Sequence, residues 1–134
     1  MIIFIILVTF WIVNPSDEIV IKDQWLRPSA AKMATALYFT IENKSDVPDT
    51  LFSVKSEISD KIQIHETYSS GDMMGMREIG SIVIEPGKDV KLEPGGKHIM
   101  VLKLKKDIKA GDKIDFILNF KRTGVISITA EAKN

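Results

Sequence analysis

The sequence contains no cysteine and has no excess of either charge, since its 134 residues include 18 basic and 18 acidic side chains. Thiol redox chemistry, thiolate zinc sites, iron–sulfur clusters and the blue-copper site with two His and one Cys all require the missing thiol. A lipid anchor attached through Cys is not expected either. Because no basic excess is available to neutralise phosphates, nucleic acid is not an expected partner.

Long hydrophobic runs are also scarce, and the single one lies at the N-terminus, where residues 2–13 are apolar apart from Thr9. A bilayer-spanning helix needs about 20 apolar residues, whereas the hydrophobic part of a secretory signal has roughly 7 to 15. No Lys or Arg precedes the run and no A-x-A cleavage site follows it. We expect residues 1–16 to be a signal peptide or an N-terminal hydrophobic segment, which could tether the chain transiently to a membrane. A buried first strand is the alternative, disfavoured by its length.

Helical periodicity is hard to find after residue 17, where hydrophobic residues recur with a period of two, which is typical of strands buried on one face. Pro-Gly pairs at 86–87 and 94–95 mark tight turns. The pattern predicts about ten short strands in one domain, residues 17–134, folded as an all-β Greek-key sandwich. The expected strands lie near residues 19–22, 36–42, 50–56, 61–65, 74–79, 81–85, 89–92, 98–104, 113–120 and 126–131.

The rarest residue types are concentrated in one interval. The only two histidines are His65 and His98, and four of the six methionines, among them Met76 and Met100, lie between residues 65 and 100. The order is His65, ten residues, Met76, twenty-one residues, His98, one residue, Met100. Imidazole nitrogens and thioether sulfurs are neutral, borderline-to-soft donors, so in the absence of thiolates this set favours Cu(I). Taken singly, each methionine could be a core residue and each histidine a structural one.

The expected strands bring part of this set together. His98 and Met100 are two residues apart in a strand, so their side chains should leave the same face. His65 should close a short strand, and Met76 should follow the turn at residues 69–72. We therefore expect a metal site assembled from strand ends at one exposed pole of the sandwich, with Met73 and Met74 as possible substitutes for Met76 during exchange.

The same spacing resembles the signature of the periplasmic copper chaperones called PCuAC. The resemblance extends over roughly residues 18–132, through Asp23-Gln24-Trp25-Leu26-Arg27-Pro28, residues 36–43, His65-Glu66-Thr67 and Pro94-Gly95-Gly96. It implies a cupredoxin-like β-sandwich that carries Cu(I) on His65, Met76, His98 and Met100. It further implies a periplasmic or extracytoplasmic chaperone that serves the dinuclear copper centre of cytochrome c oxidase. The chain ends after its last expected strand, so the Cu(II) site found in the C-terminal extension of some members is not expected.

The expected activity is binding and transfer, because no nucleophile, general base or oxyanion arrangement is visible around the two histidines, and no enzyme is predicted. The expected acceptor is the copper-centre subunit of cytochrome c oxidase or a thiol-bearing copper chaperone. Three alternatives differ in class: a copper buffering or resistance protein without a dedicated recipient, an electron-transfer cupredoxin, which normally requires Cys, and a structural sandwich that binds no metal.

Overall fold

The computed structural model describes residues 18–134, and this part of the chain is built from ten strands. The strands are β1 (Ile19–Leu26), β2 (Thr35–Asn43), β3 (Asp49–Lys55), β4 (Lys61–Ser70), β5 (Met73–Glu78), β6 (Ile82–Ile84), β7 (Asp89–Lys91), β8 (Lys97–Leu102), β9 (Lys113–Phe120) and β10 (Gly124–Ala132). The expected all-β, cupredoxin-like fold with about ten strands is confirmed. The hydrophobic segment expected over residues 1–16 lies outside the described residues.

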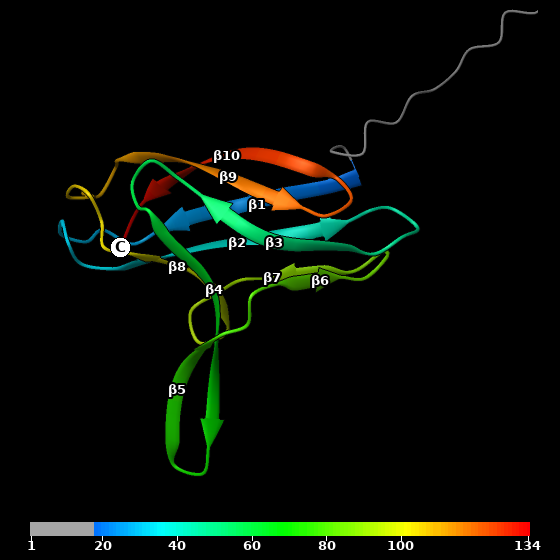
Figure 1. Ribbon diagram of the computed structural model, residues 1–134, viewed down its shortest axis with the longest axis horizontal. Helices are drawn as coiled ribbons and strands as arrows, with labels where there is room; N and C mark the ends of the chain where they lie inside the picture. Colours follow the sequence, from blue (N-terminus) through cyan, green and yellow to red (C-terminus); the bar gives the residue numbers. More distant parts are fainter. Residues whose placement is uncertain (1–17) are drawn as a thin grey trace, which may run out of the picture.

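The strands form one hydrogen-bonded path in the order β5-β4-β8-β2-β1-β10-β9-β3-β6, with β7 paired to β2. This path folds over into two layers (Figure 1). Pairing is antiparallel except between β1 and β10, where Trp25 lies beside Glu131 and Leu26 beside Ala132. The first and last strands of the described domain are therefore neighbours.

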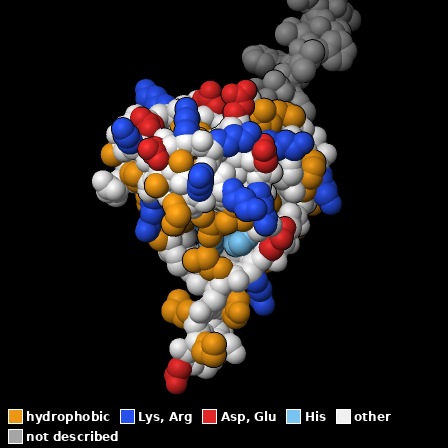
Figure 2. All heavy atoms as spheres, turned by 60° about the vertical axis from the view of Figure 1, so that its left-hand side comes forward, with side chains coloured by type: hydrophobic (Ala, Val, Ile, Leu, Met, Phe, Trp, Pro, Cys, Tyr) orange, Lys and Arg blue, Asp and Glu red, His pale blue; other side chains and the backbone are white. Residues whose placement is uncertain are grey.

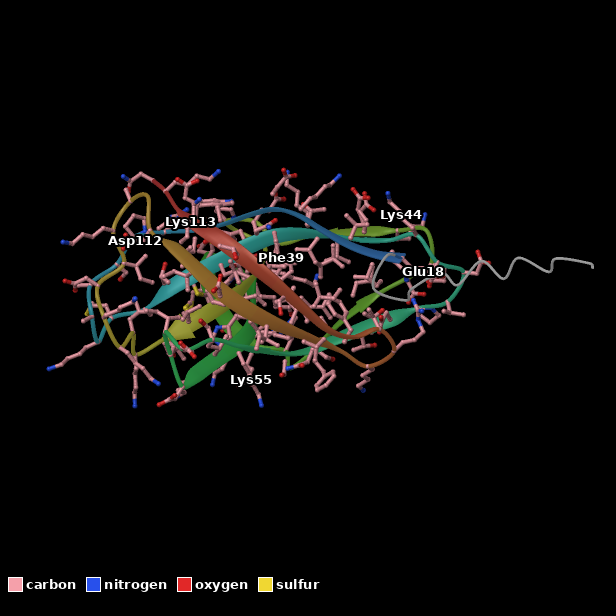
Figure 3. The ribbon with its side chains drawn as sticks, turned by 90° about the horizontal axis from the view of Figure 1, so that it is seen from above. Glu18, Phe39, Lys44, Lys55, Asp112 and Lys113 are labelled. Atoms are coloured by element: carbon pink, nitrogen blue, oxygen red, sulfur yellow. The ribbon has the colours of Figure 1, made fainter. Side chains whose placement is uncertain are left out.

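Alternating burial along the strands produces the core between the layers. In β9, Ile114, Phe116, Leu118 and Phe120 are buried while Lys113, Asp115 and Ile117 are exposed, as the period of two predicts. Phe39 of β2 is among the largest fully buried side chains, and Figure 3 shows it between the two layers, with Lys55, Asp112 and Lys113 at the periphery. This core gives the rigid support on which the histidine-bearing strands lie.

Most predicted strands are found with ends shifted by a few residues, but the expectation that His65 closes a short strand is wrong. Strand β4 continues to Ser70 and pairs with β5 from His65–Glu78 to Ser70–Met73. Pairing between β4 and β8 stops at Glu66–Lys97. Beyond Glu66, β4 is paired with β5, and its remaining link toward β8 is a hydrogen bond from the Thr67 amide to the Gly96 carbonyl, over 3.2 Å. We call residues 67–76 the arm, and Figure 1 shows it projecting from the body of the sandwich.

One face of the hairpin that forms the arm is held by packing of its own side chains. A Cβ atom on Gly75 would lie 2.8 Å from the Tyr68 ring, so the absence of a side chain on Gly75 lets the ring lie across the β5 backbone. The guanidinium of Arg77 lies 5.1 Å from the centre of the same ring and pairs with Glu66 at 2.7 Å. We call this the back face of the arm.

Within residues 18–134, no helix is long and apolar enough to span a membrane.

Candidate metal centre

The two histidines lie directly opposite each other on neighbouring strands. His65 of β4 pairs with His98 of β8 in the antiparallel register, and their ring centres are 5.7 Å apart. Side chains directly opposite one another in a sheet share a face. Ile64 and Ile99, the adjacent residues in the same two strands, point into the core and are buried. The imidazoles therefore occupy the outer face of their layer.

Each imidazole has one ring nitrogen in a hydrogen bond and the other without a partner. His65 Nε2 lies 2.8 Å from Gln63 Oε1, and His98 Nδ1 lies 3.2 Å from the Gly96 carbonyl oxygen. Both oxygens are acceptors, so these two nitrogens carry the protons. The remaining atoms, Nδ1 of His65 and Nε2 of His98, are buried and have no hydrogen-bond partner. Two lone pairs are thus left buried without a donor, an arrangement that a bound metal would satisfy.

The two predicted methionines belong to the same face. Met100 pairs with Gln63 across β8 and β4, two residues from His98, and its side chain is half-buried. Met76 of β5 pairs with Thr67 of β4, and it lies two residues from Glu78, the residue that pairs with His65. The side chain of Met76 is 58% exposed. Alternation along each strand places all four residues on one side of β5, β4 and β8. In Figure 2, a histidine side chain is visible among hydrophobic side chains at the base of the projecting arm.

An aromatic row continues from His98 across the sheet. Tyr38 of β2 lies 6.5 Å from His98 between ring centres, and Trp25 of β1 lies 4.8 Å from Tyr38. The guanidinium of Arg27 stands over both rings, at 5.8 Å from Tyr38 and 5.9 Å from Trp25. Cation–π contacts of this kind hold the aromatic rings in place. This row borders His98 on the side of β2, whereas β4, β5 and the arm lie on the opposite side of it.

Electrostatics favour a neutral imidazole at His65. Burial lowers the pKa of His65, the neighbouring His98 lowers it further, and Glu78, which lies opposite His65 on β5, raises it by a smaller amount. A neutral imidazole retains the lone pair that a metal needs.

The donor set determines which metals the centre suits. No group of three or more His, Cys, Asp or Glu side chains within residues 18–134 is arranged to hold a metal ion. The two imidazoles therefore have only the thioethers of Met76 and Met100 as further predicted donors. Thioethers are soft ligands that do not titrate, and a set of two imidazoles and two thioethers fits Cu(I) better than Zn(II) or hard cations.

The predicted residues thus share one face of three neighbouring strands, but their setting differs from the expectation of an exposed pole. His98 is 3% exposed, because Tyr38 and the neighbouring strands cover it, and His65 lies within β4 rather than at its end. Gln63 was not predicted to take part. Its position two residues before His65 is the signal that would have identified it, since such residues share a face of a strand.

Comparison with known proteins identifies the family. The sequence profile of the LpqE-like family matches residues 19–132. The chain belongs to the LpqE-like family. A protein of Leifsonia xyli subsp. xyli, Lxx21020, whose name describes it as a candidate lipoprotein, is 27% identical over 120 residues, which cover 89% of this chain and 72% of that protein.

Solved structures confirm the resemblance to PCuAC. A structure described as the copper-bound PCuAC domain from PmoF2 is 27% identical, with a TM-score of 0.74, covering 87% of this chain and 92% of that one. The solution structure of CuI-DR1885 from Deinococcus radiodurans is 26% identical, with a TM-score of 0.66, covering 84% of this chain and 78% of that one. Both relatives are described with copper bound, and the second specifically with Cu(I).

Proposed function

We propose that this protein is an extracytoplasmic copper chaperone that binds one Cu(I) through His65, Met76, His98 and Met100. The observation that carries the proposal is the pair of buried imidazole nitrogens, Nδ1 of His65 and Nε2 of His98, which have no hydrogen-bond partner and belong to residues directly opposite each other in the sheet. The copper-bound structures of related domains support the choice of metal. An exported location is supported by the LpqE-like family and its candidate lipoproteins.

Binding is tested by anaerobic competition titration with Cu(I) and a chromophoric chelator. We expect one tight equivalent, and substitution of His98 or Met100 by Ala should weaken it at least about tenfold, or about 1.4 kcal/mol. Met73→Leu is the matched control, because it also removes an exposed thioether from β5 but from the back face. Wild-type affinity in the His98→Ala variant would contradict the ligand assignment.

Transfer follows from the exposure of the outer ligands. Met76 is 58% exposed, so an incoming thiolate can reach the metal and form a shared-ligand intermediate before the imidazoles release it. Thiolates bind Cu(I) more strongly than thioethers, and copper should therefore move to a Cys-containing acceptor. We propose the copper-centre subunit of cytochrome c oxidase as the acceptor, or a thiol-bearing chaperone that supplies it, and no catalytic residue is assigned.

The acceptor is tested by mixing the Cu(I)-loaded protein with the soluble domain of that subunit under anaerobic conditions and measuring copper in the separated proteins. Copper recovered with the acceptor supports delivery. Copper that stays on the loaded protein while a small dithiol removes it would favour a buffering role without a dedicated recipient.

A further inference from the structure

The arm carries a further methionine on the same face as the proposed ligands. Met74 pairs with Ser69, and Met76 pairs with Thr67, so both methionines lie on the side of β5 that continues the face of His65. Met73, between the turn and Met74, has the opposite parity and belongs to the back face. The register therefore distinguishes two methionines that the sequence alone does not.

The two faces of the hairpin are built differently. The back face is occupied by the packing of Tyr68 on Gly75 and by the contacts of Arg77 with Tyr68 and Glu66. The front face, by contrast, presents the thioethers of Met74 and Met76, which are 74% and 58% exposed. Residues two apart in a strand are separated by about 6.5 Å along it, so the two flexible side chains can reach a common point.

Exposure of the front-face donors increases steadily from the sandwich to the end of the arm. His98 is 3% exposed, Met76 58% and Met74 74%. The aromatic row lies beside His98 on the side of β2, and the arm continues the layer on the opposite side, beyond β4. An exposed thioether binds a soft monovalent metal without having to lose a proton first.

From this arrangement we infer that Met74 is a transient Cu(I) ligand, through which copper enters and leaves the centre. The inference rests on the proposed function of the same centre. On loading, a bond from Cu(I) to the Met74 sulfur forms as one bond to the donor breaks, and the metal then passes to Met76 and the imidazoles. Copper remains Cu(I) throughout, and no proton is transferred at the thioether. Met74 contributes to the rate of exchange and not to the final affinity.

The test compares Met74→Leu with Met73→Leu, a pair matched in exposure and strand but opposite in face. Stopped-flow measurements follow transfer of Cu(I) from its bicinchoninate complex to each full chain under anaerobic conditions, and competition titrations give the equilibrium affinity. We expect Met74→Leu to slow transfer about tenfold, as for a transient ligand that lowers the barrier by about 1.4 kcal/mol. Its affinity should remain that of the wild type, and Met73→Leu should match the wild type in both measurements.

Three outcomes would overturn the inference. Unchanged transfer in Met74→Leu would show that the sulfur takes no part. Equal slowing in Met73→Leu would indicate that side chains on either face of the arm affect exchange. A weaker equilibrium affinity in Met74→Leu would make Met74 a resident ligand. Failure of the proposed function has a different signature, because the wild-type protein would then take no Cu(I) from the chelator.

Discussion

The side-chain amide of Gln63 accepts a hydrogen bond from the imidazole of His65, over 2.8 Å between Oε1 and Nε2. The two residues lie on one face of β4, and the bond places the proton of His65 on Nε2. The buried Nδ1 is thereby left with its lone pair free of any hydrogen bond. A glutamine thus selects the tautomer of a proposed ligand before any metal arrives.

Replacing Gln63 by Leu should remove the hydrogen bond that keeps the His65 proton on Nε2. We expect part of the His65 population to adopt the Nδ1–H tautomer, which long-range ¹H–¹⁵N spectra of the metal-free protein resolve. Cu(I) affinity should fall by about tenfold, at the lower end of the range for partners of metal ligands. Thr67→Val is the control, because Thr67 lies on the same face of β4 as Gln63, also two residues from His65 but after it in the sequence. An unchanged tautomer in Gln63→Leu would refute this role for Gln63.

The lowered pKa of His65 predicts a pH dependence of stability in the metal-free protein. Because the folded state favours the neutral ring, its pKa when folded lies below its pKa when unfolded. Below the unfolded value, near 6.5, the unfolded chain binds more protons, and stability declines as the pH falls further toward the folded value. Between pH 7 and pH 5, the wild type should therefore lose more unfolding free energy than the His65→Gln variant, which lacks the titrating ring. Urea unfolding at both pH values measures it, and a constant difference would contradict the prediction.

Asp49, the first residue of β3, should be important for stability alone. It is 2% exposed, and its carboxylate accepts hydrogen bonds from the backbone amides of Thr50, Arg122 and Thr123 and from the Thr123 hydroxyl. Burial opposes ionisation of Asp49, but these hydrogen bonds outweigh it and leave the pKa below its usual value. The stabilisation should therefore be present at neutral pH and disappear as the pH falls through that lowered pKa.

Asp49→Asn retains the size of the side chain but replaces one acceptor oxygen with a donor. We expect a loss of about 1–3 kcal/mol in unfolding free energy at pH 7, the usual cost of leaving buried polar groups unpaired. Urea unfolding measures this loss, and copper affinity provides the complementary readout, which should remain unchanged. A variant as stable as the wild type would contradict the prediction.

The packing of the arm can be tested at Gly75. An added methyl group would lie 2.8 Å from the Tyr68 ring, so Gly75→Ala should displace the ring and disturb its contact with Arg77. We expect faster amide hydrogen exchange in β5 with little change in the melting temperature, because the arm lies outside the core. Gly71→Asn is a suitable comparison, since Gly71 has φ 61° in the turn and nothing near its missing Cβ, and Asn tolerates this conformation. Unaltered exchange in Gly75→Ala would show that the ring does not hold the arm.

Local sequence patterns were enough to predict the strands whose two faces differ. Strand β9 alternates between buried and exposed side chains as predicted, and His98 and Met100 share a face because the period of two applies within one strand. The spacing of rare residue types pointed to the four proposed ligands for a chemical reason, namely that few other soft donors exist in the chain.

The length of β4 could not be predicted in this way, because both faces of the arm are exposed and residues 66–70 show no hydrophobic alternation. Their strand conformation depends on pairing with β5. The pairing of His65 with His98, and hence the burial of His98, depends on the register between strands separated by 26 residues, from Ser70 to Lys97. Registers of this kind are determined by the packing of whole faces rather than by local sequence.

The parallel pairing of β1 with β10 makes the fold depend on its most distant parts. Strand β10 lies between β1 and β9 in the strand order. Until β10 is present, β1 has an unpaired edge, β9 and β3 are not connected to β1 and β2, and the core remains open to water. Long-range pairing of this kind slows folding. A growing chain should therefore complete the domain, and with it the layer that carries His65 and His98, only after its final strand has been synthesised.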